Sequence, residues 1–183
     1  TGVVIAGQRP YEFDWANRTT DDHPVLLPLV SADGWRVTDL KNAEATVSTG
    51  TNRVLFGEGV LHVDYSGTGG AASFRIRPAA PVAVPDGADT LAVWLYGNSL
   101  WGKPCPSVEI VADFTDANGQ AFSLPLYHMS HLEWFLVQKK FPPELKARLA
   151  HGAKFEGFTV SGGTFEKRVY GGDIADNKAN SHN

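Results

Sequence analysis

Hydrophobic and polar side chains alternate with a period of two along much of the chain. The clearest case is segment 90–96, TLAVWLY, in which three aliphatic side chains alternate with an alanine and two aromatic rings. Successive side chains of a strand point to opposite faces of its sheet, so both faces of this strand are apolar. A sheet with one face in water carries polar residues on that face. This strand is therefore expected to be covered on both sides or to offer aromatic rings to a ligand.

Similar short segments recur along the chain and are separated by glycine, proline and asparagine. Besides 90–96, the sequence predicts strands over 11–15, 44–49, 53–56, 60–66, 71–77, 108–114, 121–126, 132–141, 153–161 and 165–174. The segment 78–87, rich in proline and alanine, is predicted to be a connector. Strands separated by turn residues every 8–12 residues or so indicate an all-β sandwich.

Only one segment has the character of a helix. In 142–151, PPELKARLAH, proline stands in the first turn, with Glu144 early and Arg148 late. This arrangement of charges suits the helix dipole, and Gly152 stands where a glycine commonly ends a helix. We expect one short helix near 142–150.

Length and charge limit the domain count and the partners. A chain of 183 residues fits one domain, which we place at 10–175, with an N-terminal extension at 1–9 and a polar tail or linker stub at 176–183. The net charge is −4 without a long basic run, which argues against nucleic acid and anionic membranes as partners. No segment approaches the ~20 apolar residues of a membrane span. Cys105 is the single cysteine, so no intrachain disulfide is expected.

An ordered series of motifs resembles jelly-roll carbohydrate-binding modules of the galactose-binding-like type. The motifs are YEFD at 11–14, LAVWLYG at 91–97, DANGQ at 116–120, Trp134 followed by FP at 141–142, FEGF at 155–158 and YGGDI at 170–174. Such modules are appended to secreted bacterial glycoside hydrolases and polysaccharide lyases. The resemblance implies a jelly-roll β-sandwich of two antiparallel sheets. It also implies a non-catalytic module, extracellular or periplasmic, that targets the parent enzyme to a polysaccharide and has the parent's other domains as partners.

Sugar binding gives the first set of candidate site residues. Aromatic rings match the apolar faces of a pyranose, and polar side chains fix its hydroxyl groups. The candidates are Trp94, Tyr96, Trp101, Tyr127, Arg75, Arg77 and His128. If Trp94 and Tyr96 share an outward face with the two arginines, they would form a binding platform. The alternative is that the two rings belong to the core.

The resemblance also implies a structural Ca²⁺ where the first and last strands meet. The acids at the matching positions are Glu12, Asp14 and Asp173, and Glu58 could join them. Ca²⁺ takes six to eight oxygen ligands. The alternative is that these acids are solvated or pair with basic side chains. A transition metal is not expected, because His128 and His131 lack a third ligand at a diagnostic spacing.

The sequence argues against an enzyme. Glu109 and Asp113 are four residues apart on one predicted strand, which places them roughly 13 Å apart, too far for a glycosidase pair. No nucleophile elbow, phosphate loop or metalloprotease helix is present. Two alternatives stay open beside the binding module. One is a structural spacer without a ligand, and the other is a jelly-roll polysaccharide lyase in which Tyr127, His128 and Arg75 converge on a groove.

Overall fold

The described part of the chain consists of antiparallel strands and one short helix. The structure is a computed structural model that describes residues 25–52, 54–55, 57–67, 71–98, 108–129, 132–162 and 168–170. Its elements are β1 (Trp35–Lys41), β2 (Ala43–Gly50), β3 (Val60–Gly67), β4 (Ala72–Pro78), β5 (Val82–Ala83), β6 (Thr90–Asn98), β7 (Val108–Thr115), β8 (Ala121–Met129), β9 (Leu132–Lys140), α2 (Pro143–Arg148), β10 (Lys154–Gly162) and β11 (Arg168–Tyr170). The expected strand at 11–15, Cys105 and the proposed limits of the domain lie outside these residues.

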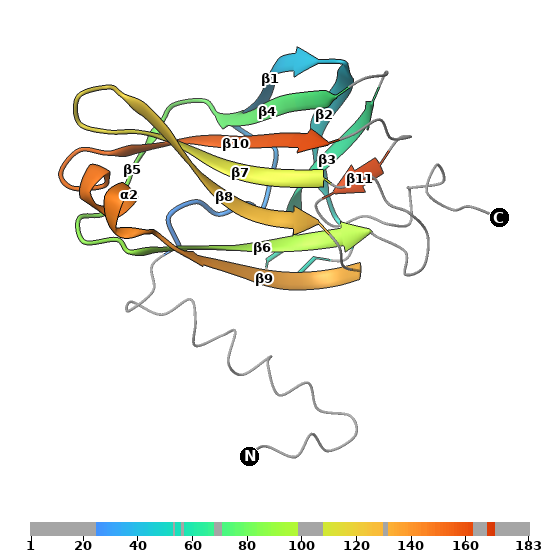
Figure 1. Cartoon of the computed structure of the whole chain (residues 1–183). Helices are drawn as coiled ribbons and strands as arrows, with labels where there is room; N and C mark the ends of the chain where they lie inside the picture. The colour runs from blue at the N-terminus through green and yellow to red at the C-terminus, as the bar shows by residue number, and fades with distance from the viewer. Residues whose placement is uncertain are drawn as a thin grey trace.

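The strands form three hydrogen-bonded groups. The largest is a six-stranded sheet in the order β1-β4-β10-β7-β8, with β5 paired to β10. The other two are β11-β3-β2 and the pair β6-β9. Figure 1 shows β4, β10, β7 and β8 side by side, and β6 beside β9.

One apolar core joins the large sheet to the smaller groups. Phe74 of β4 and Leu124 of β8 belong to the same buried cluster as Val63 of β3, Val93 of β6 and Val137 of β9. The prediction of an all-β sandwich with one short helix is confirmed.

Alternation along β4 and β8 gives the large sheet a polar outer face. Phe74 and Ile76 are 1% and 5% exposed, and the intervening side chains of β4 point away from the core. In β8, Phe122 and Leu124 are buried while Ser123 between them is exposed. The polar residues of these strands therefore gather on the surface of the sheet that faces away from the core.

Two predicted segments differ from the structure. In the segment 53–56, Val54 and Leu55 are described and lie outside any strand, so the strand predicted there is wrong. Gly57 follows with a φ of 70°, and the chain turns at this point. The predicted connector 78–87 contains the two-residue strand β5, which pairs with Lys154 and Phe155 of β10.

The predicted helix forms but is shorter than expected. Helix α2 runs over Pro143–Arg148 and is capped at Leu149. His151 and Gly152 then have φ values of 44° and 95°, so a left-handed turn returns the chain to β10. No helix in the described residues is long and apolar enough to span a membrane.

Candidate functional site

The outer face of the six-stranded sheet contains a hollow of about 490 Å³. Side chains of β4, β7, β8 and β10 line it, and the charged groups among them are Arg75, Arg77, Asp113 and Glu156. The register explains why they meet, because β10 lies between β4 and β7 in the sheet. Polar groups from segments far apart in the sequence thus converge on one surface.

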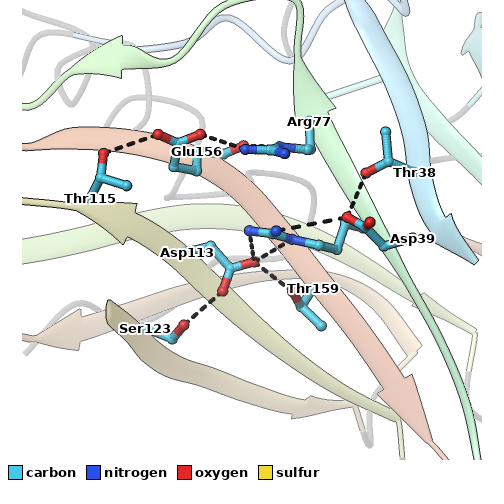
Figure 2. A network of polar contacts seen from close by, with 9 residues as sticks. Thr38, Asp39, Arg77, Asp113, Thr115, Ser123, Glu156 and Thr159 are labelled. Carbon is cyan, nitrogen blue, oxygen red and sulfur yellow. Dashed lines mark hydrogen bonds and ion pairs between the residues drawn. The ribbon is translucent and has the colours of Figure 1, made fainter. Parts of the chain in front are cut away.

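Asp113 is the most heavily bonded group in the hollow. It is 7% exposed, and Figure 2 shows partners on both of its carboxylate oxygens. Arg75 donates to Oδ2 from Nε at 3.2 Å and approaches it with Nη2 at 3.0 Å. The hydroxyl of Thr159 donates to Oδ2 at 2.5 Å, and that of Ser123 donates to Oδ1 at 2.7 Å. Hydrogen bonds to a carboxylate are stronger than those between neutral groups, so this side chain is held in one orientation.

Glu156 forms a second ion pair beside the first. Arg77 donates from Nη2 to Oε2 of Glu156 at 2.6 Å, and the hydroxyl of Thr115 donates to Oε1 at 3.0 Å. The Nε of Arg77 also donates to the backbone oxygen of Glu156 at 3.4 Å. The two ion pairs lie side by side across β4, β10 and β7 (Figure 2).

A β-bulge places Glu156 on this face. Phe155 pairs with Phe114 and Gly157 pairs with Asp113, so Glu156 is the extra residue of β10. Gly157 adopts a φ of 132°, a conformation that side-chain-bearing residues rarely adopt. Bulges of this kind redirect a side chain within a sheet, and here the bulge sets Glu156 beside Arg77.

A second bulge, in the edge strand β1, positions Asp39. The pairing of β1 with β4 shifts between Thr38 and Lys41, and Asp39 has a φ of 53°. Its carboxylate accepts a hydrogen bond from the Thr38 hydroxyl at 3.0 Å and lies 3.7 Å from Nη1 of Arg75. Arg75 thus has carboxylates on two sides.

A second hollow, of about 390 Å³, continues the polar surface along the same strands. Lys41, Ser73, Glu109 and Ser161 are among the residues that line it. Ser161 pairs with Ser73 on one side and with Glu109 on the other. Because Ser73 and Arg75 are two residues apart on β4, the two hollows lie one after the other on a single face.

The structure separates the residues of the predicted aromatic platform. Arg75 and Arg77 lie on β4 in the six-stranded sheet, whereas Trp94 and Tyr96 lie on β6, which pairs with β9. The condition for a platform, that these four residues share one outward face, is therefore not met. The cause is the pairing of the strands, which alternation within one strand does not reveal.

Tyr96 is a buried ring. Its side chain is on the face of β6 opposite to the core residue Val93, yet it is only 2% exposed. Its ring packs edge-on against Trp134 of β9, with the ring centroids 5.4 Å apart. Of the two alternatives, the covered ring holds for Tyr96, so the ligand contact predicted for this residue is wrong. Trp94 on the same face is half-buried.

The side chains of Tyr127 and His128 point to opposite faces of the sheet at the end of β8. Tyr127 lies opposite the core residue Ile110 and packs against Phe135, with the ring centroids 5.4 Å apart. His128 is exposed and lies opposite Glu109. Because a shift in the β7–β8 register turns Tyr127 toward the core side, it does not share the face of Arg75. The convergence expected for a lyase is therefore absent from these three residues.

The calcium prediction falls mainly outside the described residues. Glu12, Asp14 and Asp173 lie outside them, as does the ligand candidate Trp101. Glu58 is exposed in the turn that follows residue 57. Within the described ranges, no three or more His, Cys, Asp or Glu side chains are grouped so that they could hold a metal ion. The calcium site stays a prediction.

Sequence reasoning did not select Glu156 or the hydroxyl groups that hold the carboxylates. A signal for Glu156 was present, because Gly157 interrupts an otherwise alternating strand, and a glycine inside a strand often marks a bulge. No comparable signal marks Thr115, Ser123 and Thr159, whose roles depend on strand pairing.

Comparison with known proteins gives matches in structure only. No family model matches the chain, and no curated protein matches it. A solved structure of carbohydrate-binding modules from the β-sandwich superfamily, described as promiscuous in specificity, matches with a TM-score of 0.54 at 12% identity over 75% of this chain and 54% of that chain. The enzymatically active domain of tailspike protein 4 from bacteriophage CBA120 matches with a TM-score of 0.52 at 15% identity, over 80% of this chain and 20% of that chain.

A third match is TmCBM61 in complex with β-1,4-galactotriose, with a TM-score of 0.45 at 18% identity, over 80% of this chain and 91% of that chain. The chain thus spans about half the length of the first matched structure and a fifth of the tailspike chain. At these identities the likeness concerns the fold, which is the β-sandwich fold of carbohydrate-binding modules.

Proposed function

We propose that this protein is a non-catalytic carbohydrate-binding module and that its glycan lies on the outer face of the six-stranded sheet. The observation that carries the proposal is the hollow in which two ion pairs are held in place by hydroxyl groups. The hollow occurs on a fold shared with carbohydrate-binding modules. Fold alone does not determine function, so the hollow carries the argument.

The groups in the hollow match the chemistry of sugar hydroxyls, which both donate and accept hydrogen bonds. The guanidinium groups of Arg75 and Arg77 are donors, and the carboxylates beside them are acceptors. The hydroxyl protons of Ser123 and Thr115 are directed to the carboxylates, which leaves their oxygens to accept from a ligand. Because these groups are already ordered, little side-chain entropy is lost when a ligand binds.

The role of the module follows from the same proposal. It would hold a parent polysaccharide-degrading enzyme on its substrate outside the cell, with the parent's other domains as neighbours. The sequence resemblance supports this role, and the polar character of the face supports a glycan as the ligand. Trp94 on β6 is the alternative contact surface.

Calorimetric titration with a panel of neutral and acidic oligosaccharides tests the proposal. Ala121 is exposed and lines the hollow, so Ala121→Trp should block it and weaken binding at least tenfold. Ala92 is exposed on β6 beside Trp94, and Ala92→Trp should bind as the wild type does. Both variants should keep the wild-type melting temperature. Absence of binding to every glycan would refute the function, and a loss confined to Ala92→Trp would move the site to β6.

One observation favours a second candidate, a structural spacer without a ligand. The charged groups of the hollow satisfy one another, as they would if their purpose were to join the strands of the sheet. A spacer would bind no member of the panel. It would still unfold more easily when Arg75 or Asp113 is replaced, so stability measurements alone do not distinguish the two candidates.

A further inference from the structure

We infer that the hollow selects uncharged glycans and that Glu156 is the residue that excludes chains containing uronates. This inference rests on the proposed function, because it concerns the ligand class of the same face. It depends on the balance of charge in the lining of the hollows, on the contacts that each guanidinium group already makes and on the position of Glu156.

Positive and negative groups balance in the lining of the two hollows. In the first hollow, the guanidinium groups of Arg75 and Arg77 face the carboxylates of Asp113 and Glu156. The second hollow adds one charge of each sign, from Lys41 and Glu109. Around this lining lie Arg36 opposite Arg77, Asp39 near Arg75, and Lys154 opposite Thr115. A lining without excess positive charge offers little attraction to a polyanion.

The guanidinium groups inside the hollow are already engaged. Arg75 contacts Asp113 through two nitrogens and lies 3.7 Å from Asp39 through the third. Arg77 is bound through two nitrogens to the side chain and the backbone of Glu156. A ligand carboxylate would have to displace one of these partners or lie against it. A neutral hydroxyl can instead donate to carboxylate lone pairs that remain open.

Glu156 is better placed than Asp113 to act as the filter. Asp113 accepts hydrogen bonds from Arg75, Ser123 and Thr159, and its negative charge is compensated by two nitrogens of the Arg75 guanidinium. Glu156 pairs with a single nitrogen of Arg77 and one hydroxyl. Glutamine has nearly the same shape as glutamate and can accept from Arg77 through its carbonyl oxygen. The Glu156→Gln substitution therefore keeps a hydrogen bond to Arg77 but removes the negative charge, so the positive charge of Arg77 is no longer compensated.

The experiment compares matched pairs of oligosaccharides that differ only in charge. Suitable pairs are galacturonate oligomers with their carboxyl-reduced counterparts, and cello-oligosaccharides with their C6-oxidised counterparts. Binding constants are measured by calorimetry for the wild type and for Glu156→Gln. We expect the wild type to bind the neutral member of a pair at least tenfold more tightly. Glu156→Gln should narrow that ratio at least fivefold, through tighter binding of the uronate.

Two further variants make the result specific. Glu44 is exposed on β2, in a different sheet, and Glu44→Gln makes the same chemical change and should leave the ratio as in the wild type. Asp39→Asn changes an exposed side chain and should also narrow the ratio of neutral to uronate binding. This variant provides the test if Glu156→Gln does not fold.

The outcomes separate this inference from the proposed function. Equal or tighter binding of the uronate by the wild type would refute the inference and leave a glycan-binding module. An equal change in Glu44→Gln and Glu156→Gln would also refute it, because the effect would then come from net charge. Absence of binding to every member of every pair would refute the proposed function itself and the inference with it.

Discussion

Gly157 on β10 lies so close to Ile76 on β4 that a Cβ atom at position 157 would collide with the Ile76 carbonyl oxygen. The φ of 132° at Gly157 is also one that L-amino acids rarely adopt. Because glycine has no Cβ atom, it allows the bulge at this position, and the bulge in turn sets Glu156 beside Arg77. The backbone conformation at Gly157 thus determines that the hollow contains the ion pair of Glu156 and Arg77.

We predict that Gly157→Ala lowers the free energy of unfolding by at least about 2 kcal/mol, because backbone strain and the collision with Ile76 act together. Gly87→Ala is the matched control. Gly87 also has a positive φ, of 80°, but nothing lies within 4 Å of its added Cβ, so about 1 kcal/mol is expected. Denaturant unfolding of both variants measures the difference. Equal losses would show that the contact with Ile76 is unimportant.

The second prediction concerns the ion pair of Asp113 and Arg75. Asp113→Ala removes the partner of a half-buried guanidinium and the acceptor of two hydroxyl groups, so we expect a loss of about 2–4 kcal/mol. Asp86→Ala is the control, because the contact of Asp86 with His151 is exposed to solvent, and its loss should stay within about 0.5 kcal/mol. Denaturant unfolding is again the measurement, and a small effect of Asp113→Ala would contradict the structural importance of the network.

The third prediction is a pH dependence located at Asp116, in the turn between β7 and β8. The backbone N–H of Gln120 donates to its carboxylate and lowers the pKa of Asp116, and Arg148 of α2 and the backbone of Asn118 act in the same direction. A carboxyl with a lowered folded pKa stabilises the native state above its unfolded pKa, and the stabilisation is lost as the pH falls through the folded pKa.

Acidification below a pH of about 4 should therefore lower the melting temperature less steeply in Asp116→Asn than in the wild type. Melting curves recorded across this range, with both proteins in the same buffers, supply the comparison. Parallel slopes for the two proteins would mean that Asp116 does not contribute to acid unfolding.

The fourth prediction follows from the proposed calcium site at Glu12, Asp14 and Asp173. An ion that binds only the folded protein raises its stability, so EDTA should lower the melting temperature and added Ca²⁺ should restore it. The double variant Glu12→Gln, Asp14→Asn should show no response to either addition. If EDTA leaves the melting temperature of the wild type unchanged, a structural calcium ion is excluded.

Local patterns along the sequence predict much of the fold. The alternation in 71–77 identifies Phe74 and Ile76 as core residues and places Arg75 on the outer face, as the structure has them. These outcomes depend only on the two-residue alternation of a strand, which is visible within the residues of each segment. The helix at 142–150 is likewise a local signal.

The composition of the site depends on strand pairing and was not predictable in the same way. Alternation places Trp94 and Arg75 on outward faces, but only the pairing of β6 with β9 shows that they belong to different sheets. Tyr96 lies on an outward face and is nevertheless buried. The bulge at Glu156 brings a carboxylate to Arg77 across β4 and β10, a contact between residues 79 positions apart.

The location of the glycan is the central claim, and a titration followed by two-dimensional ¹H–¹⁵N NMR tests it most directly. Adding a neutral oligosaccharide that binds should shift the backbone amides of Ser123 and Thr159 and the Nε–H of Arg75, and should leave the indole N–H of Trp94 in place. Shifts at Trp94 and along β6, with the amides of the hollow unchanged, would contradict the account.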